Sequence, residues 1–381
     1  MFTIIFAKIL SLFMSLMIAF GTLFGVFEKS TTKKPELYFD GNIKNVIFMI
    51  GDGMGFNHLE KTKKEREVSL VMDTFDIKGK SMTRSLSSDV TDSAAGGTAL
   101  ATGVRTGNGI VASYYFDKTS KFSYPKSLTE LCRESGKMTG VITTDSTSGA
   151  TPAAFSAHSS DRDDAQDISD DQLKSDIDLI WGEANGVVTE TSAAENGFEY
   201  VETYDEMIAL EEGSRSFGQF APSLWMLEPE NSPNLEQMAE KAVDLLDDTD
   251  EGFFLMIEGA HIDKHSHSND SEKMTEALLE FDRTIEAMLG YAKADGETLV
   301  VVTADHETGG ITLDGDSYVF TTEDHTGADV PVLVYGTDKL IASGDRLNNY
   351  EIAIRVSYIL GFERRDFPKS IYVGLENKKK R

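Results

Sequence analysis

Short apolar segments, separated by longer stretches with a helical pattern, constrain the fold of this chain most strongly. Rich in Val, Ile, Phe or Met, they lie at 45–50, 138–143, 253–257, 298–303 and 331–335. Runs of this length are typical of strands buried on both faces. Apolar residues recur every three or four positions at 235–246, 274–288 and 350–360, which predicts amphipathic helices. The alternation predicts an α/β fold with a central, largely parallel sheet sandwiched by helices.

Polar residues follow four of the predicted strands at the point where each strand ends. They are Asp52, Asp145, Glu258 and the pair Asp305-His306. In parallel α/β sheets, ligands bind beyond the carboxyl ends of the strands. We therefore expect these side chains to gather at one edge of the sheet and to form a functional site.

The charge of the chain limits its partners. Acidic residues outnumber basic ones 64 to 36, for a formal net charge of −28. Such a surface disfavours nucleic acid as a partner, since phosphate backbones need basic surface. A site for phosphate would need local positive charge from metal ions or from a few Arg and Lys side chains. The single cysteine, Cys132, excludes an intramolecular disulfide, and its apolar context predicts a core position.

The chain divides into four predicted regions. Residues 1–28 contain an uncharged apolar run typical of an export signal or an uncleaved signal anchor, which predicts an extracellular, cell-surface or periplasmic protein. Residues 29–44 form a polar linker, 45–374 the folded domain and 375–381 a basic tail. Within the domain, the acidic segment 159–215 is predicted to form loops and short helices that cover one sheet edge.

Ser93 lies in a segment of small residues, TDSAAGGTA, that resembles a helix start. Asp92 can cap this helix, which places Ser93 near a helix N-terminus, where free N–H groups favour an anion. A serine nucleophile needs activation, and no histidine is its neighbour in sequence, so a metal could stabilise the alkoxide. The alternative is a capped helix that is merely packed tightly.

Histidines and carboxylates cluster further along the chain. Asp263 and His267 are four residues apart, which suits chelation from one helical turn, and Asp305-His306 and His325 follow. Mixed His and carboxylate ligands suit zinc, whereas an all-oxygen set suits magnesium. The remaining histidines, which we expect to be structural or supporting, are His58, His158, His261 and His265.

Two further residues have a functional and an ordinary interpretation. Arg162 offers a planar fork that fits two phosphate oxygens, but an arginine after an acidic loop is usually a surface ion pair. Asp52 lies between glycines in IGDGMG, where ions can approach closely, but D-G also marks an ordinary turn.

In chain order, these motifs resemble the alkaline phosphatase family from about residue 45 to 336. The matching segments are IGDGMG, TDSAAGGTALATG, ATPAAFSAHSSDR, EGAHIDKHSHSND, TADHETGG and EDHTG. The resemblance implies the fold of that family over 45–374, hydrolysis of phosphate monoesters, two zinc ions, a magnesium-like third ion and a homodimer.

The resemblance also implies roles for individual residues. Ser93 matches the nucleophile that becomes a phosphoserine, and Arg162 matches the arginine that clamps the phosphoryl group. The matched ligands are Asp52, Asp305 and His306 for the zinc that activates the serine, Asp263, His267 and His325 for the other zinc, and Asp52, Thr151 and Glu258 for the third ion.

The chain departs from the family pattern at Gly149, where members commonly carry Asp or His, two residues before Thr151. This departure puts the occupancy and identity of the third ion in question. Two alternatives remain: a phosphodiesterase or another hydrolase of the same superfamily, and a metal-stabilised protein that binds phosphate without turnover. Ser93 together with Arg162 favours monoesters over diesters.

Overall fold

The computed structural model describes residues 38–114, 123–222 and 231–362. The predicted signal or anchor, most of the linker and the basic tail lie outside these ranges. Among the described residues, none of the helices has the length and apolar character needed to cross a bilayer.

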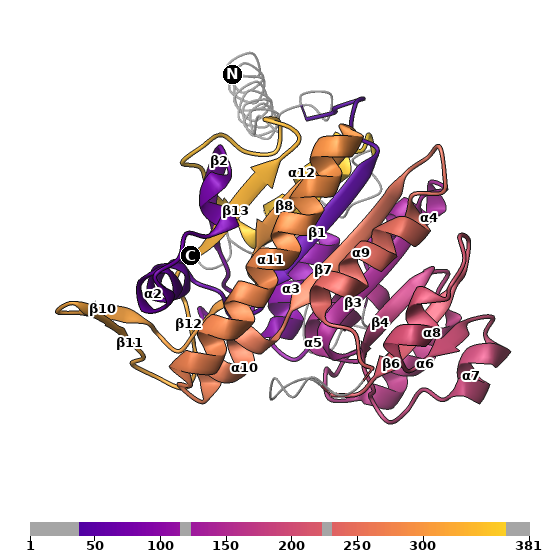
Figure 1. Cartoon of the computed structure of the whole chain (residues 1–381), viewed down its shortest axis with the longest axis horizontal. Helices are drawn as coiled ribbons and strands as arrows, with labels where there is room; N and C mark the ends of the chain where they lie inside the picture. The colour runs from indigo at the N-terminus through magenta and orange to yellow at the C-terminus, as the bar shows by residue number, and fades with distance from the viewer. Residues whose placement is uncertain (1–37, 115–122, 223–230, 363–381) are drawn as a thin grey trace, which may run out of the picture. The chain divides into compact units, whose positions relative to one another are not determined.

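Ten strands of the described residues form one sheet (Figure 1). In spatial order they are β14 (Arg346–Asn348), β2 (Ile77–Met82), β13 (Val330–Tyr335), β8 (Thr298–Thr303), β1 (Asn45–Gly51), β7 (Phe253–Gly259), β3 (Met138–Ser146), β4 (Leu179–Glu183), β6 (Ser216–Phe220) and β5 (Glu199–Val201). Strand β13 runs antiparallel to β2 and β8, and the other pairings in this sheet are parallel. The predicted largely parallel sheet is confirmed.

Two short antiparallel ribbons lie outside the main sheet. They pair β10 (Thr312–Asp314) with β11 (Ser317–Val319), and β9 (Glu307–Thr308) with β12 (His325–Thr326). The helices are α2 (Phe56–Arg66), the 3-10 helix η2 (Val71–Thr74), α3 (Ser93–Thr102), α4 (Leu128–Glu134), α5 (Ala150–Ser156), α6 (Ala165–Lys174), α7 (Glu190–Glu195), α8 (Tyr204–Ile208), α9 (Leu235–Leu246), α10 (His261–His267), α11 (Ser271–Asp295) and α12 (Asn349–Ile359).

The sheet separates two apolar cores, as the alternation of side chains along a strand requires. On β1, Ile47 and Met49 pack with α9 and α11, while Phe48 packs on the opposite face with α3, α5 and α12. Figure 1 shows α9 and α11 lying across the near face of the strands. Fully burying a side chain of this size contributes about 1.5–3 kcal/mol. Cys132 is buried in the second core, as predicted, and burial raises the pKa of its thiol to about 12.

The prediction for segment 159–215 was wrong in part. Helices α6, α7 and α8 are present, but β4 and β5 lie in the same segment and β6 follows directly, so the segment extends the sheet rather than covering its edge. Trp181 of β4 and Phe217 of β6 are fully buried. These strands have three to five residues in acidic surroundings, too short to show a distinct apolar run.

Candidate active site

The polar residues predicted at strand ends do gather at one edge of the sheet. Asp52 follows β1, Glu258 lies one residue before the end of β7, and Asp305 follows β8, which are three adjacent strands. The turn after β1 requires glycine at position 53, where φ is +71°. A Cβ atom there would lie 2.9 Å from the Cβ of Asp263, so the glycine also lets α10 approach Asp52 closely.

Ser93 is the first residue of α3, and its position follows from the packing of that helix. The Asp92 carboxylate accepts a hydrogen bond from the backbone N of Ala95 at 2.9 Å, which confirms the predicted cap. A Cβ atom at Gly97 would lie 3.2 Å from the Cβ of Ala154, so the small residue lets α5 pack closely against α3. The buried Ser93 Oγ lies 3.1 Å from His306 Nε2. The fold thus supplies the histidine that the local sequence lacks.

The first cluster of metal-type ligands consists of Asp52, Asp305 and His306, whose ligand atoms all lie within 4.8 Å of one another. His306 Nε2 is 3.4 Å from Asp52 Oδ1 and 3.2 Å from Asp305 Oδ2. These two carboxylate oxygens are buried and have no hydrogen-bond partner among the described residues. Burial, and then the charge of Asp305, raise the pKa of Asp52 well above its usual range. Two buried carboxylates side by side need a cation to offset their repulsion, so this donor set fits a metal ion.

The second cluster consists of Asp263, His267 and His325, again with ligand atoms within 4.8 Å of one another. His325 Nδ1 lies 3.0 Å from the backbone oxygen of Thr91, and His267 Nδ1 contacts that of Glu323. A carbonyl oxygen only accepts, so each Nδ1 carries a proton and donates it. Each Nε2 therefore faces Asp263, at 3.3 Å for His267 and 3.6 Å for His325. This arrangement orients histidine ligands toward a metal.

The two clusters are neighbours, because the rings of His306 and His325 stack with their centroids 3.6 Å apart. Without a metal, the hydrogen bond to Asp263 raises the pKa of His267 to about 9. A proton then occupies the position that a cation would take, so cation binding here must displace it.

Thr151 of α5 and Glu258 of β7 form a third, all-oxygen group. Both side chains are 1% exposed, and neither Thr151 Oγ1 nor Glu258 Oε1 has a hydrogen-bond partner of ordinary geometry among the described residues. Burial, and then the charge of Asp145, raise the pKa of Glu258 to about 8. The negative charge of Glu258 also raises the pKa of Asp52, so this group adjoins the first cluster. Oxygen donors of this kind suit a hard cation such as Mg²⁺.

Arg162 lies beside the start of α3. Its Nη1 atom is 3.3 Å from Asp92 Oδ2, and its backbone N donates to the oxygen of Gly109 at 2.8 Å. Asp92 Oδ2 also accepts from the backbone N of Gly109 at 2.8 Å. One third of the Arg162 side chain remains exposed, so its guanidinium, held beside the residue that precedes Ser93, can still meet a ligand from solvent.

Sequence reasoning missed one residue of this site, Thr308. Its hydroxyl donates to Asp263 Oδ1 and lies 3.2 Å from His306 Nδ1, so it contacts members of both clusters. Its position two residues after His306 was the available signal. His58 is structural, as predicted: its Nδ1 accepts from the backbone N of Gly55 at 3.1 Å, and burial lowers its pKa to about 3.

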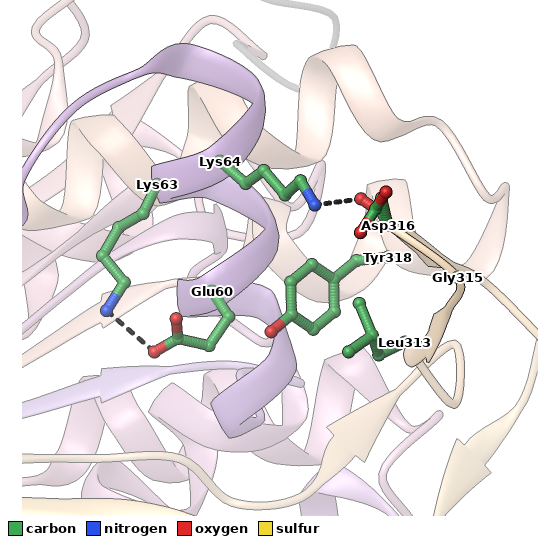
Figure 2. A pocket seen from close by; sticks show the side chains of 7 residues that line it. All are labelled: Glu60, Lys63, Lys64, Leu313, Gly315, Asp316 and Tyr318. Atoms are coloured by element: carbon green, nitrogen blue, oxygen red, sulfur yellow. Dashed lines mark hydrogen bonds and ion pairs between the residues drawn. The ribbon is translucent and has the colours of Figure 1, made fainter.

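A separate surface hollow of about 390 Å³ lies between α2 and the β10–β11 hairpin (Figure 2). Both of its lysines have partners within the hollow. Lys63 Nζ is 2.8 Å from a Glu60 carboxylate oxygen, and Lys64 donates to the backbone oxygen of Asp316. No residue of the clusters described above lines this hollow, so it lies apart from the candidate site.

Comparisons with known proteins agree with this geometry. A family model described as alkaline phosphatase matches residues 43–187 and 170–323. Alkaline phosphatase 4 of Bacillus subtilis (strain 168) is 34% identical over 310 residues, which cover 75% of this chain and 65% of that protein. Alkaline phosphatase of Escherichia coli (strain K12) is 27% identical over 337 residues, 70% of each protein. The chain covers 65% and 63% of two B. subtilis relatives, less than two thirds of their length.

Solved structures share the fold. The alkaline phosphatase from the Antarctic bacterium TAB5 matches with a TM-score of 0.73 at 29% identity, over 84% of this chain and 99% of that one. The Thermus thermophilus alkaline phosphatase matches with a TM-score of 0.76 over 93% of this chain and 99% of that one, at 19% identity. Sequence, fold and the order of the motifs agree: the chain belongs to the alkaline phosphatase family.

Proposed function

We propose that this protein is an alkaline phosphatase that hydrolyses phosphate monoesters to an alcohol and inorganic phosphate, with Ser93 as nucleophile. The observation that carries the proposal is the position of Ser93 Oγ, which is 3.1 Å from His306 Nε2 at the N-terminus of α3. A hydroxyl at this position contacts the first set of metal-type ligands, which adjoins the second set through the stack of His306 and His325, and it lies at the dipole of a helix N-terminus.

Ser93 and Arg162 carry the steps that the chain itself performs. The guanidinium of Arg162 holds two oxygens of the phosphoryl group. Ser93 Oγ loses its proton and forms a bond to phosphorus as the bond to the alcohol oxygen breaks, and the leaving alcohol oxygen takes up a proton. Water then attacks the phosphoserine in line, which releases inorganic phosphate and restores the hydroxyl.

Two zinc ions and one magnesium ion complete the proposal. Asp52, Asp305 and His306 would hold one zinc, and the second cluster would hold the other. Asp52, Thr151 and Glu258 would hold the magnesium. When bound, such ions neutralise the entering and leaving oxygens and lower the pKa of water. A TAB5 alkaline phosphatase mutant has Mg bound in a site named M3, which supports a third cation.

The first experiment compares hydrolysis of p-nitrophenyl phosphate and bis-p-nitrophenyl phosphate from about pH 7 to 10.5, before and after chelation. We expect monoesterase activity that rises into alkaline pH and returns with zinc and magnesium. A preference for the diester would favour the alternative phosphodiesterase and refute the proposal.

The second experiment replaces the nucleophile. Ser93→Ala should lower the rate by several orders of magnitude, because no covalent intermediate can form. Labelling with ³²P-phosphate at low pH should mark the parent and leave the variant unmarked, while circular dichroism stays the same. Turnover near that of the parent would remove Ser93 from the mechanism.

We also propose that residues 1–28 direct export, that 45–374 form the catalytic domain and that the protein is a homodimer. The uncharged apolar run supports export, and family membership supports the domain and the dimer. N-terminal sequencing of secreted material and light scattering test these points. Cytoplasmic retention or a monomeric mass would contradict them.

A further inference from the structure

A carboxylate fills the space beside Gly149, where the chain lacks a side chain. A Cβ atom at this residue would lie 2.5 Å from Asp145 Oδ2 and 2.9 Å from Asp145 Cγ. Gly149 is also the N-cap residue of α5, two positions before Thr151. The Asp145 carboxylate therefore stands where the side chain of residue 149 would begin, next to the first turn of α5.

Asp145 is held so that one of its two oxygens stays available. Oδ1 accepts from the backbone N of Ser146 at 2.7 Å and from Lys264 Nζ. Oδ2 accepts no hydrogen bond from the part of the chain that the structure describes. The fixed oxygen anchors the carboxylate, and the other points over Gly149.

A short relay connects Asp145 to Glu258. The backbone N of Asp145 donates to Thr143 Oγ1 at 2.8 Å, and the Thr143 hydroxyl donates to Glu258 Oε2. After burial, the negative charge of Asp145 is the largest cause of the raised pKa of Glu258. These links place Asp145 at the all-oxygen group rather than on an independent surface.

The all-oxygen group contains buried oxygen atoms that are free to bind a cation. Among the described residues, neither Glu258 Oε1 nor Thr151 Oγ1 has a hydrogen-bond partner of ordinary geometry, although both residues are only 1% exposed. Leaving a buried polar atom unpaired costs about 1–3 kcal/mol, more when it is charged. Carboxylate and hydroxyl oxygens without nitrogen or sulfur donors suit a hard divalent cation.

We propose that Asp145 Oδ2 is a ligand of the third cation, directly or through one water, and takes the place left empty at Gly149. The cation is Mg²⁺ or a similarly hard divalent ion, and Lys264 neutralises the second oxygen of Asp145. The inference rests on the third site of the proposed function. It explains how this chain keeps a carboxylate at that site although residue 149 has no side chain.

The test is calorimetric titration of Mg²⁺ into the zinc-loaded full chain, which measures binding without turnover. Asp145→Asn keeps the size of the side chain and removes its charge. It should raise the Kd for Mg²⁺ about tenfold or more, the usual effect of losing a partner at a metal site. Gly149→Ala should weaken binding as well, because its methyl group would displace Oδ2.

Two matched controls separate this effect from general damage. Asp244→Asn removes an exposed carboxylate on helix α9 that pairs with Lys241 at 3.1 Å. Gly290→Ala adds a methyl group on α11 where no heavy atom lies within 4 Å apart from its chain neighbours and the nearby backbone of its own helix. Both should bind Mg²⁺ as the parent does, within about twofold.

The outcomes distinguish this inference from the proposed function. An unchanged Kd in Asp145→Asn, with loss of binding in Glu258→Gln, would overturn the role of Asp145 and leave the third site in place. An unchanged Kd in both variants would overturn the third site as well. Zinc content and monoesterase activity of the parent test the proposed function independently. Thermal melting shows whether Gly149→Ala folds. If it does not, the Kd for Mg²⁺ of the isosteric Asp145→Asn variant tests the role of Asp145 by itself.

Discussion

Replacing Glu258 with glutamine should stabilise the metal-free protein at alkaline pH. Burial and the charge of Asp145 raise the pKa of Glu258 from 4.5 to about 8. A carboxyl whose pKa is higher in the folded state binds its proton more tightly there, so folding loses stability as pH rises from the unfolded to the folded pKa. At 1.36 kcal/mol per pH unit, the free energy of unfolding is lower by about 5 kcal/mol above pH 8 than below pH 4.5. About 4 kcal/mol of this loss develops between pH 5 and 8.5.

Glutamine removes this titration and keeps an oxygen that can accept from the Thr143 hydroxyl. Urea unfolding of the chelated parent and of Glu258→Gln at pH 5 and pH 8.5 measures the difference. The parent should lose about 4 kcal/mol more than the variant over this interval. The surface change Glu240→Gln on α9 serves as control and should follow the parent.

Adding zinc and magnesium should reverse the order of stability, since the cation stabilises the carboxylate and not the amide. Equal losses of stability with pH in the chelated parent and in Glu258→Gln would refute the reasoning, because Glu258 would then not carry the buried charge.

Two further predictions concern the surroundings of Ser93. Arg162→Ala should raise the inhibition constant for inorganic phosphate about tenfold or more, since a charge-assisted contact is lost, and Arg162→Lys should recover only part of it; an inhibition constant equal to that of the parent in both would contradict the phosphate contact. Asp92→Ala should lower the free energy of unfolding by about 1 kcal/mol through loss of the α3 cap and should raise KM by releasing Arg162. Asp92→Asn, which can still cap, should raise KM with little loss of stability, and an unchanged KM in both Asp92 variants would separate Arg162 from substrate binding.

The sequence predicted the centre of the sheet well and its margins poorly. The five apolar runs correspond to β1, β3, β7, β8 and β13, which are largely buried. Strand β2 was not predicted, because its sequence, IKGKSM, contains two lysines and the strand is only partly buried. The margins depend on pairing with neighbouring strands, and pairing is not a property of the local sequence.

For the site, the motifs predicted which residues would gather but not how they would touch. That Asp263 and His267 share one helical turn follows from their spacing. That His306 reaches Ser93, or that Asp145 fills the space at Gly149, depends on how β8, α3 and the turn before α5 pack together. Such contacts between distant segments leave no local pattern in the chain.

Two ligands of the first cluster lie far apart in the sequence, since Asp52 follows β1 and Asp305 follows β8, although these strands are neighbours in the sheet. A metal ion held between them would close a loop that contains most of the domain, in a chain whose single cysteine permits no covalent staple. Removing the ion with a chelator should therefore release this constraint, and resistance to proteolysis should fall as the ion is lost.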